Sequence, residues 1–238
     1  MKFIEDLREC AEKFGITLDD YRLKQFDTYF GMLIDWNEKI NLTAITEPHE
    51  VAVKHFIDSL SCHDEKYFSD GASVIDVGTG AGFPGIPLKI FRPDIKLTLL
   101  DSLQKRVNFL SAVCDTLSIK DVEIIHARAE DGARQKEHRE RYDVAVSRAV
   151  ARMSVLAEYA LPYVRTGGYF LALKGAKFDE EADEAKRAIA TLGGKIEKIS
   201  PVKLPTLDDK RAIIAVKKIK ATPKTYPRKA GTPEKKPL

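Results

Sequence analysis

From residue 73 onward, short apolar runs alternate with longer amphipathic stretches, and this alternation constrains the fold more than any other feature of the chain. Two of the amphipathic stretches, 103–117 and 153–164, are long enough to form helices. Strands that alternate with helices predict right-handed βαβ crossovers and a parallel sheet with helices on both faces. The strands predicted in this way are 73–77, 96–101, 122–126, 143–147 and 169–174.

The end of the sheet is predicted to be antiparallel. The last two strand-like segments, 195–204 and 211–219, are joined by the short polar loop 205–210. A loop of this length cannot contain a helical crossover, so the two strands should form a hairpin. The whole pattern predicts an α/β, Rossmann-like fold with seven strands, mostly parallel, and an antiparallel C-terminal hairpin.

The residues before this region are predicted to be helical. Leu23, Phe26, Phe30 and Leu33 recur at three- and four-residue spacing and indicate a helix over 19–40. Thr46, followed by Glu47 and Pro48, is typical of the start of a second helix. We therefore expect a helical N-terminal extension over 1–66, the α/β domain over 67–220 and a separate tail over 221–238.

The tail is strongly basic although the net charge of the chain is only +3. The last 22 residues contain eight Lys and Arg, one Glu and four Pro, with few apolar side chains. Such a segment buries too little surface to offset its ordering entropy, so we expect it to be extended or disordered. A solubilising end and a phosphate-binding arm both remain open as its role.

Neither a signal peptide nor an apolar run that could span a membrane is apparent, so we expect a cytoplasmic protein. The odd number of cysteines, which are Cys10, Cys62 and Cys114, and the lack of a CxxC pair argue against disulfides and zinc. His49 and His55 are six residues apart, which is outside the spacing of a helical zinc pair. No metal site is predicted.

A glycine-rich turn follows the first predicted strand. Its pattern, Asp76, Gly78, Gly80 and Gly82, differs from the dinucleotide fingerprint, whose third glycine position is here Phe83. A dinucleotide brings a pyrophosphate to such a turn, which a neighbouring carboxylate would oppose. S-adenosylmethionine carries a sulfonium and an ammonium, which Asp76 would attract. The turn therefore favours S-adenosylmethionine, and bulky residues at 78 or 82 should abolish its binding without disturbing the fold.

The next strand ends should supply the other cofactor contacts, because ligands of open α/β sheets lie across the carboxyl ends of the strands. Asp101 is placed to accept hydrogen bonds from the ribose, Ala129 and Glu130 lie where adenine is expected, and Arg148 stands at the mouth of the site. Structural roles stay open for these side chains: a helix cap for Asp101, a surface acid for Glu130, and a pair with Asp143 or Asp76 for Arg148.

The acceptor of the methyl group is suggested by what the chain lacks. The fourth strand is followed by SRAVAR instead of the [DN]-PP-[YF] motif of enzymes that methylate exocyclic amines. Neither the cysteine nucleophile needed to methylate cytosine C5 nor the Lys-Asp-Lys-Glu set used for ribose 2′-hydroxyls is apparent. A ring nitrogen such as guanine N7 needs no base, because its lone pair is free and it carries no proton. A guanine must be unstacked from its neighbours to reach the methyl group, which favours loops of RNA as the substrate.

Several motifs resemble the bacterial small-subunit rRNA guanine-N7 methyltransferase family RsmG, also called GidB. The resemblance covers nearly the whole chain, and its YPRKAGTPEKKPL ending is similar to that of members from Gram-positive bacteria; other members lack this extension. The motifs that carry it are WNEKINLTAIT (36–46), KHFIDSL (54–60), DVGTGAGFPGIPLKI (76–90), LLDSLQKRVNFL (99–110), RAED (128–131), SRAVARMSVL (147–156) and LALKG (171–175).

The resemblance implies a class I S-adenosylmethionine-dependent methyltransferase that modifies N7 of one guanine in the 530 loop of 16S rRNA. It implies that Gly78, Phe83, Ala129, Glu130 and Arg148 contact the cofactor. It also implies that Arg148, Lys174 and the pair His55 and Asp58 face the RNA, although a hydrogen bond within one helix would equally explain that pair, and a solvated lysine would explain Lys174.

No catalytic base is expected, so Arg148 and Lys174 are candidates for positioning the substrate. The remaining alternatives are a methyltransferase for a small molecule and a non-catalytic cofactor-binding scaffold. We expect a monomer whose partner is 16S rRNA.

Overall fold

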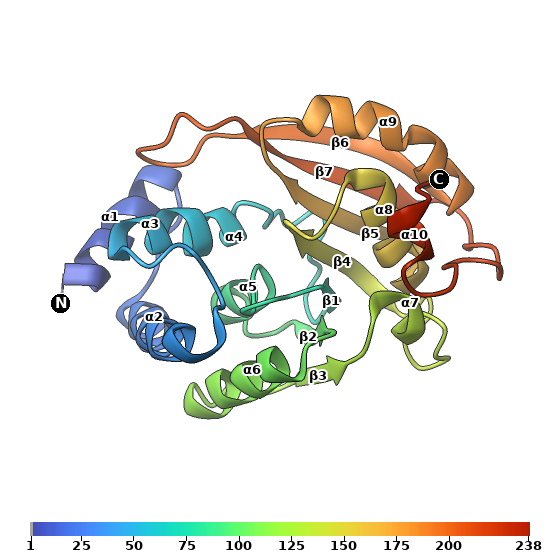
Figure 1. Ribbon diagram of the computed structural model, residues 1–238. Helices are drawn as coiled ribbons and strands as arrows, with labels where there is room; N and C mark the ends of the chain where they lie inside the picture. Colours follow the sequence, from blue (N-terminus) through green and yellow to red (C-terminus); the bar gives the residue numbers. More distant parts are fainter. Residues whose placement is uncertain (1) are drawn as a thin grey trace.

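The computed structural model describes residues 2–238, and its centre is a seven-stranded sheet in the order β3-β2-β1-β4-β5-β7-β6 (Figure 1). Strands β1 to β5 are parallel, and β7 is antiparallel to both β5 and β6, so the predicted terminal hairpin is confirmed. The strands are β1 (Ser73–Val77), β2 (Lys96–Asp101), β3 (Val122–His126), β4 (Tyr142–Arg148), β5 (Val164–Lys174), β6 (Gly194–Val202) and β7 (Arg211–Lys218).

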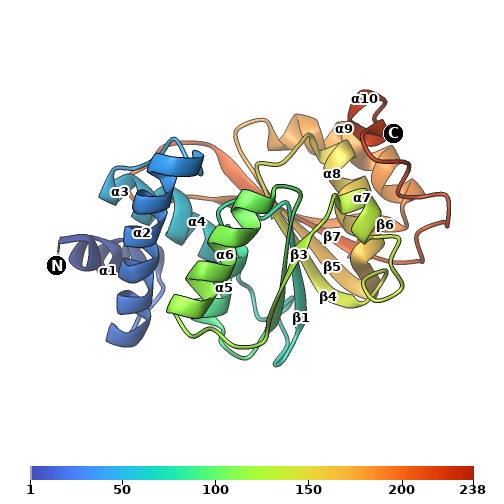
Figure 2. The ribbon, with the colours of Figure 1, turned by 60° about the horizontal axis from the view of Figure 1, so that its bottom comes forward.

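Helices cover both faces of the sheet, as the alternation of elements predicts (Figure 2). The elements on the face that carries the N-terminus are α1 (Lys2–Phe14), α2 (Asp20–Ile40), α3 (Pro48–Val51), η1 (Ala52–Ile57), α4 (Asp58–Leu60), α5 (Gly85–Phe91) and α6 (Gln104–Thr116). Those on the other side are α7 (Ala129–Gly132), α8 (Met153–Ala160), η2 (Leu161–Tyr163), α9 (Phe178–Thr191) and α10 (Thr232–Lys235).

Two apolar cores lie on the two faces, because alternate residues of a strand point to opposite sides. In β1, Val74 belongs to the core shared with the N-terminal helices, whereas Ile75 and Val77 belong to the core beneath α8 and α9. The N-terminal helices add Leu23, Phe26 and other buried side chains to the first of these cores. They are therefore continuous with the sheet domain and do not form a core of their own.

The two predicted N-terminal helices are present, but the second is irregular. Helix α2 begins after Asp19, whose side chain accepts a hydrogen bond from the backbone nitrogen of Arg22 at 2.8 Å. The second begins at Pro48 and passes through the π-helical segment η1 before α4. π-Helical turns inside helices are rare and concentrate at functional sites. This one carries His55.

The C-terminal segment differs from the sequence-based expectation, because residues 222–238, here called the C-terminal arm, follow a defined path over α8 and include α10 (Figure 2). Thr222, Pro227 and Pro233 are buried. The arm is held by polar contacts, which its composition does not reveal: side chains of the sheet domain hydrogen-bond to its backbone. Of the two expectations for this segment, extended or disordered, the arm resembles the first: apart from α10 it contains neither helix nor strand, and its path is fixed by these contacts.

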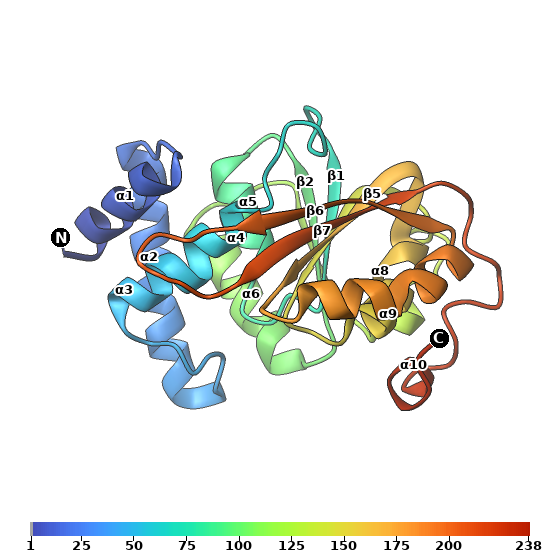
Figure 3. The same ribbon diagram turned by 90° about the horizontal axis from the view of Figure 1, so that it is seen from above.

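The loop between β6 and β7 reaches the N-terminal helices (Figure 3). There the hydroxyl of Thr206 lies 2.9 Å from Nε2 of His49 on α3. Cys10, Cys62 and Cys114 are free, and all three are buried. Within residues 2–238, no helix is both long enough and apolar enough to cross a membrane.

Candidate cofactor and substrate site

A cavity of about 570 Å³ opens at the carboxyl ends of β1, β2 and β4, where an open α/β sheet binds its ligands. It brings together seven of the nine predicted cofactor contacts, and residues from the N-terminal helices and the C-terminal arm complete it. The predicted contacts that line it are Gly78, Gly80, Phe83, Asp101, Ala129, Glu130 and Arg148. The additions include Leu42, Thr43, His55, Tyr159, Gly231 and Glu234.

The glycine turn is shaped by backbone conformations that favour glycine. Gly78 and Gly80 have φ values of +72° and +63°, in the left-handed region. A Cβ on Gly78 would lie 2.8 Å from the side chain of Val150, whereas a Cβ on Gly80 would meet nothing within 4 Å. The backbone at Gly80 is therefore open to a ligand, and Val150 closes over Gly78.

Asp76 and Gly82 support this turn from below, and neither is among the described residues that line the cavity. Oδ2 of Asp76 accepts hydrogen bonds from the Thr79 hydroxyl at 2.7 Å and from the Gly85 amide at 2.8 Å. A Cβ on Gly82 would lie 2.5 Å from the buried hydroxyl of Tyr29. The expectation that a bulky residue at 82 spares the fold is therefore corrected: that position is packed against helix α2.

Burial changes the ionisation of Asp76. The side chain is fully buried, and its Oδ1 has no hydrogen-bond partner among the described residues. Desolvation raises the pKa of Asp76 to about 7, although the bonds from Thr79 and Gly85 act in the opposite direction. Asp76 therefore holds the turn through its hydrogen bonds. Its negative charge, which the sequence suggested would attract a cation, depends on pH and on any cation placed above it.

Asp101 connects the end of β2 to the glycine turn. Its Oδ2 accepts a hydrogen bond from the Gly80 amide at 3.0 Å, and its Oδ1 accepts one from the Leu103 amide at 2.9 Å. Arg106 lies 3.4 Å from Oδ2. Helix α6 begins after Leu103 and has no side-chain cap, so Asp101 does not have the helix-cap role considered from the sequence. Its carboxylate instead lies in the cavity wall and joins the glycine turn to the residue before α6.

Ala129 and Glu130 begin the short helix α7, which forms the far wall of the cavity. The carbonyl of Ala129 accepts a hydrogen bond from the Tyr163 hydroxyl at 2.7 Å, which fixes the helix against η2. Glu130 is 4% exposed, so the surface role considered for it is excluded. Its Oε1 accepts a hydrogen bond at 2.7 Å from the amide of Gly231 in the C-terminal arm.

Arg148 lies at the centre of a polar network. It forms an ion pair with Asp58 at 3.0 Å and donates to the carbonyl of Lys54 at 2.9 Å, so neither Asp143 nor Asp76 is its partner. Asp58 also accepts a hydrogen bond from Arg211 at 2.8 Å. His55 and Asp58, which the sequence placed on one helix face, both contact Arg148: Nδ1 of His55 lies 3.2 Å from Nη2 of Arg148.

Phe83 is covered by this network. The imidazole of His55 stacks on its ring at a centroid separation of 4.6 Å, and the Arg148 guanidinium lies 4.8 Å from the ring centroid. Burial and the neighbouring Arg148 lower the pKa of His55 to about 3. The imidazole is therefore neutral at physiological pH and adds no positive charge to the cavity.

A second cavity of about 330 Å³ adjoins the first, and His55, Arg148 and Ala149 line both. Its wall includes Lys54, Lys174 and Arg211. Lys174, which the sequence placed near the substrate, donates to the carbonyl of Ala151 at 2.9 Å and pairs with Glu181 at 2.7 Å. The ends of β4 and β5 and the start of β7 thus build a basic recess beside the larger cavity.

Sequence reasoning missed Arg211, the π-helical segment η1 and the C-terminal arm. Arg211 had a detectable signal, because it is the first residue of a strand predicted to end the sheet. The arm had none, since its anchoring depends on Arg134, Arg139 and Glu158, whose positions follow only from the fold.

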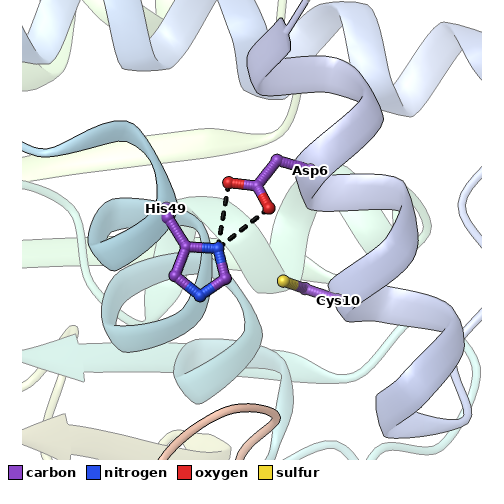
Figure 4. A group of neighbouring side chains, drawn as sticks. All are labelled: Asp6, Cys10 and His49. Atoms are coloured by element: carbon purple, nitrogen blue, oxygen red, sulfur yellow. Dashed lines mark hydrogen bonds and ion pairs between the residues drawn. The ribbon is translucent and has the colours of Figure 1, made fainter.

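Asp6, Cys10 and His49 form a cluster of groups that could bind a metal, and the spacing argument did not consider it (Figure 4). Nδ1 of His49 points to the Asp6 carboxylate at 2.8 Å, and its Nε2 is engaged with Thr206. Desolvation raises the pKa of Cys10 to about 11. Both ring nitrogens have protein partners and the thiol is protonated, so the cluster acts as a clamp between α1, α3 and the β6–β7 loop.

Comparisons with known proteins agree on the type of protein. The GidB family, described as rRNA small subunit methyltransferase G, matches residues 22–213. The chain is 51% identical to ribosomal RNA small subunit methyltransferase G of Alkaliphilus metalliredigens, covering 98% of this chain and 97% of that protein. It is 50% identical to the protein of the same name from Clostridium perfringens, covering 100% of both.

Solved structures agree on the fold. A SAM dependent methyltransferase from Aquifex aeolicus superposes with a TM-score of 0.54 at 18% identity, covering 71% of this chain and 93% of that one. TYW2 of M. jannaschii, solved in complex with AdoMet, gives a TM-score of 0.51 at 14% identity over 63% of this chain and 70% of that one. With its sheet topology and full-length relatives, this chain belongs to the GidB family, rRNA small subunit methyltransferase G.

Proposed function

We propose that this protein transfers the methyl group of S-adenosylmethionine to N7 of a guanine in the 530 loop of 16S rRNA. Membership of the GidB family establishes that the reaction is the transfer of a methyl group. What we propose beyond this is the identity of the cofactor, of the acceptor atom and of the RNA loop. The observation that supports it best is the hydrogen bonding of the glycine turn, which suits a cofactor without phosphates.

Five amides of the turn are already bonded within the protein. Those of Gly78 and Thr79 donate to the carbonyl of Leu100 at 2.9 and 3.0 Å. The amide of Gly80 donates to Asp101, and those of Gly82 and Phe83 donate to the Thr79 carbonyl at 3.0 Å. A pyrophosphate binds at such a turn through free amides. Their engagement, together with the carboxylate of Asp76, argues against a dinucleotide.

The cavity wall fits the parts of S-adenosylmethionine. Asp101 would accept hydrogen bonds from the ribose hydroxyls, Ala129 and Glu130 would face the adenine, and the open backbone at Gly80 would allow a close approach. When bound, the cofactor supplies an electrophilic methyl group on a positively charged sulfur. The neutral imidazole of His55 does not repel that charge, because its pKa lies far below physiological pH.

The second cavity would hold the guanine. Arginine and lysine donors recognise guanine oxygen O6 and nitrogen N7. Arg148 lines both cavities, so it stands where the two reactants would meet, and Lys174 lines the second cavity alone. A donor directed to O6 leaves the lone pair of N7 free for attack, and no proton must be removed. Catalysis would then consist of aligning N7, the methyl group and the sulfur in a site without bulk water.

We assign these steps to the domain over 67–220 and propose that the helical extension over 1–66 takes part in them. Thr43 and His55 of this extension line the larger cavity, and the hydroxyl of Thr43 lies 2.8 Å from Nε2 of His55. The extension therefore completes the wall that separates the cofactor from the guanine recess.

The test is to incubate the protein with methyl-labelled S-adenosylmethionine and, separately, 30S subunits, naked 16S rRNA or a metabolite extract. We expect label in 16S rRNA. Label confined to a metabolite would support a small-molecule enzyme, and saturable cofactor binding without any transfer would support a scaffold; either result contradicts the proposal.

Arg148→Lys provides a second test, with Arg187→Lys on the exposed face of α9 as the matched control. We expect the first change to lower the rate of methyl transfer at least about tenfold, because lysine cannot reproduce the forked contacts of the guanidinium. The control should keep the wild-type rate. An unchanged rate for Arg148→Lys would give this side chain a purely structural role.

A further inference from the structure

We propose that the C-terminal arm forms part of the binding site for the adenosyl end of S-adenosylmethionine, with Gly231 holding Glu130 in position; this rests on the proposed function. The arm is absent from the matched family region, 22–213, and its composition had suggested a disordered or RNA-binding tail. The structure instead places it against the cavity. Three sets of contacts carry the inference.

The first set is an ion pair that fixes the middle of the arm. Glu158 on α8 is 0% exposed, and its carboxylate accepts hydrogen bonds from the backbone nitrogen of Arg228 at 2.7 Å and from Nη2 of Arg228 at 2.6 Å. A buried carboxylate without a partner is costly. The pair therefore ties the arm to the helix that lies beside the cavity.

The second set fixes the backbone that precedes Arg228. Arg139 donates to the carbonyls of Thr222 and Tyr226, both at 2.9 Å, and Arg134 donates to the carbonyl of Pro227 at 2.8 Å. Guanidinium groups of the sheet domain thus bind main-chain oxygens of the arm. Because these contacts recognise backbone atoms, they define the path of the chain toward α10.

The third set reaches the cavity itself. Gly231 donates its amide hydrogen to Oε1 of Glu130 at 2.7 Å, and both Gly231 and Glu234 line the cavity. Glu130 is the carboxylate expected at the adenine. Its Oε1 is held by the arm, and its second oxygen, Oε2, can then accept a hydrogen bond from a bound ligand. Gly231 is thus a positioning residue.

This arrangement also limits how the arm can bind RNA. Lys218 is in strand β7 and fully buried, and the guanidinium of Arg228 is engaged by Glu158. The positive charge that remains exposed around the arm belongs to lysines: Lys220, Lys224, Lys229, Lys235 and Lys236. Contact with RNA would use these side chains, and contact with the cofactor would use the backbone at Gly231, so mutations can separate the two roles.

The experiment measures binding of S-adenosylmethionine and S-adenosylhomocysteine by calorimetry for the full chain and for a chain ending at Lys229. The shorter chain keeps Arg228 and its partner but lacks Gly231 and α10. We expect both dissociation constants to rise about tenfold, the effect of losing a hydrogen bond to a charged group. The matched control is the full chain with Lys235→Gln and Lys236→Gln, which should bind both ligands as tightly as the wild type.

Arg228→Ala, with Lys229→Ala as its control, tests the anchor in the full-length chain. Arg228→Ala should weaken cofactor binding, and thermal unfolding should show that the protein remains folded. Unchanged dissociation constants in both the shortened chain and Arg228→Ala would overturn the inference, and a flatter salt dependence of RNA binding in the shortened chain would then assign the arm to RNA. Failure of the full-length protein to bind S-adenosylmethionine would instead refute the proposed function.

Discussion

Two glycines of the same turn should respond differently to alanine. Gly80 and Gly82 both have positive φ values, +63° and +97°, so each substitution strains the backbone by roughly 1–2 kcal/mol. At Gly80 the added Cβ meets nothing within 4 Å. At Gly82 it would lie 2.5 Å from the Tyr29 hydroxyl and 2.6 Å from Cδ1 of Ile86, and both side chains are buried. Overpacking of this kind costs about 1–3 kcal/mol more.

We therefore expect Gly82→Ala to lower the free energy of unfolding by about 2–5 kcal/mol and Gly80→Ala by about 1–2 kcal/mol. Urea unfolding of the protein without ligand measures both values. Binding of S-adenosylmethionine should instead be weakened more by Gly80→Ala than by Gly82→Ala, because Gly80 lines the cavity and Gly82 does not. Equal losses of stability in the two variants would refute the claim that Gly82 is packed against helix α2.

Two further predictions concern buried ionisable groups. The pKa of Asp76 is raised to about 7, so the folded state keeps a proton that the unfolded state has lost, and this group lowers stability by about 1.4 kcal/mol for each pH unit between about 4 and 7. Asp76→Asn should remove that slope, which urea unfolding at pH 5 and pH 7 would show; a parallel pH dependence in both proteins would contradict it. Lys218, whose pKa burial lowers to about 8, donates to the carbonyls of Leu161 and Val164. Lys218→Met should cost about 3–5 kcal/mol in unfolding by leaving these acceptors and Glu140 without their partner, and a loss below 1 kcal/mol would show that the site repacks.

The sequence predicted the sheet because its signals are local. Apolar runs mark each strand, and the short loop 205–210 by itself requires the antiparallel hairpin. Most residues that line the larger cavity follow from the rule that ligands lie at strand ends, which predicts Asp101, Glu130 and Arg148. These inferences needed only the position of a residue along its own strand.

The inferences that failed concern contacts between distant segments. Asp76 was expected to face the ligand, but its side chain points to the core face of β1 and holds the turn from beneath. The arm was expected to be extended or disordered, and its anchoring by partners such as Glu158, 70 positions earlier in the chain, was not foreseen. Composition reports the apolar surface of a segment and contains no record of the acceptors and donors that the rest of the fold presents to it.

The most direct test of the central claim is the position of the methyl group in RNA. Unmodified 16S rRNA or 30S subunits would be incubated with the protein and methyl-labelled S-adenosylmethionine, and the label would be mapped by nuclease digestion and mass spectrometry. We expect one N7-methylguanine within the 530 loop, and its loss when Arg148 is replaced. Label on another atom, on another loop or on no RNA would contradict it.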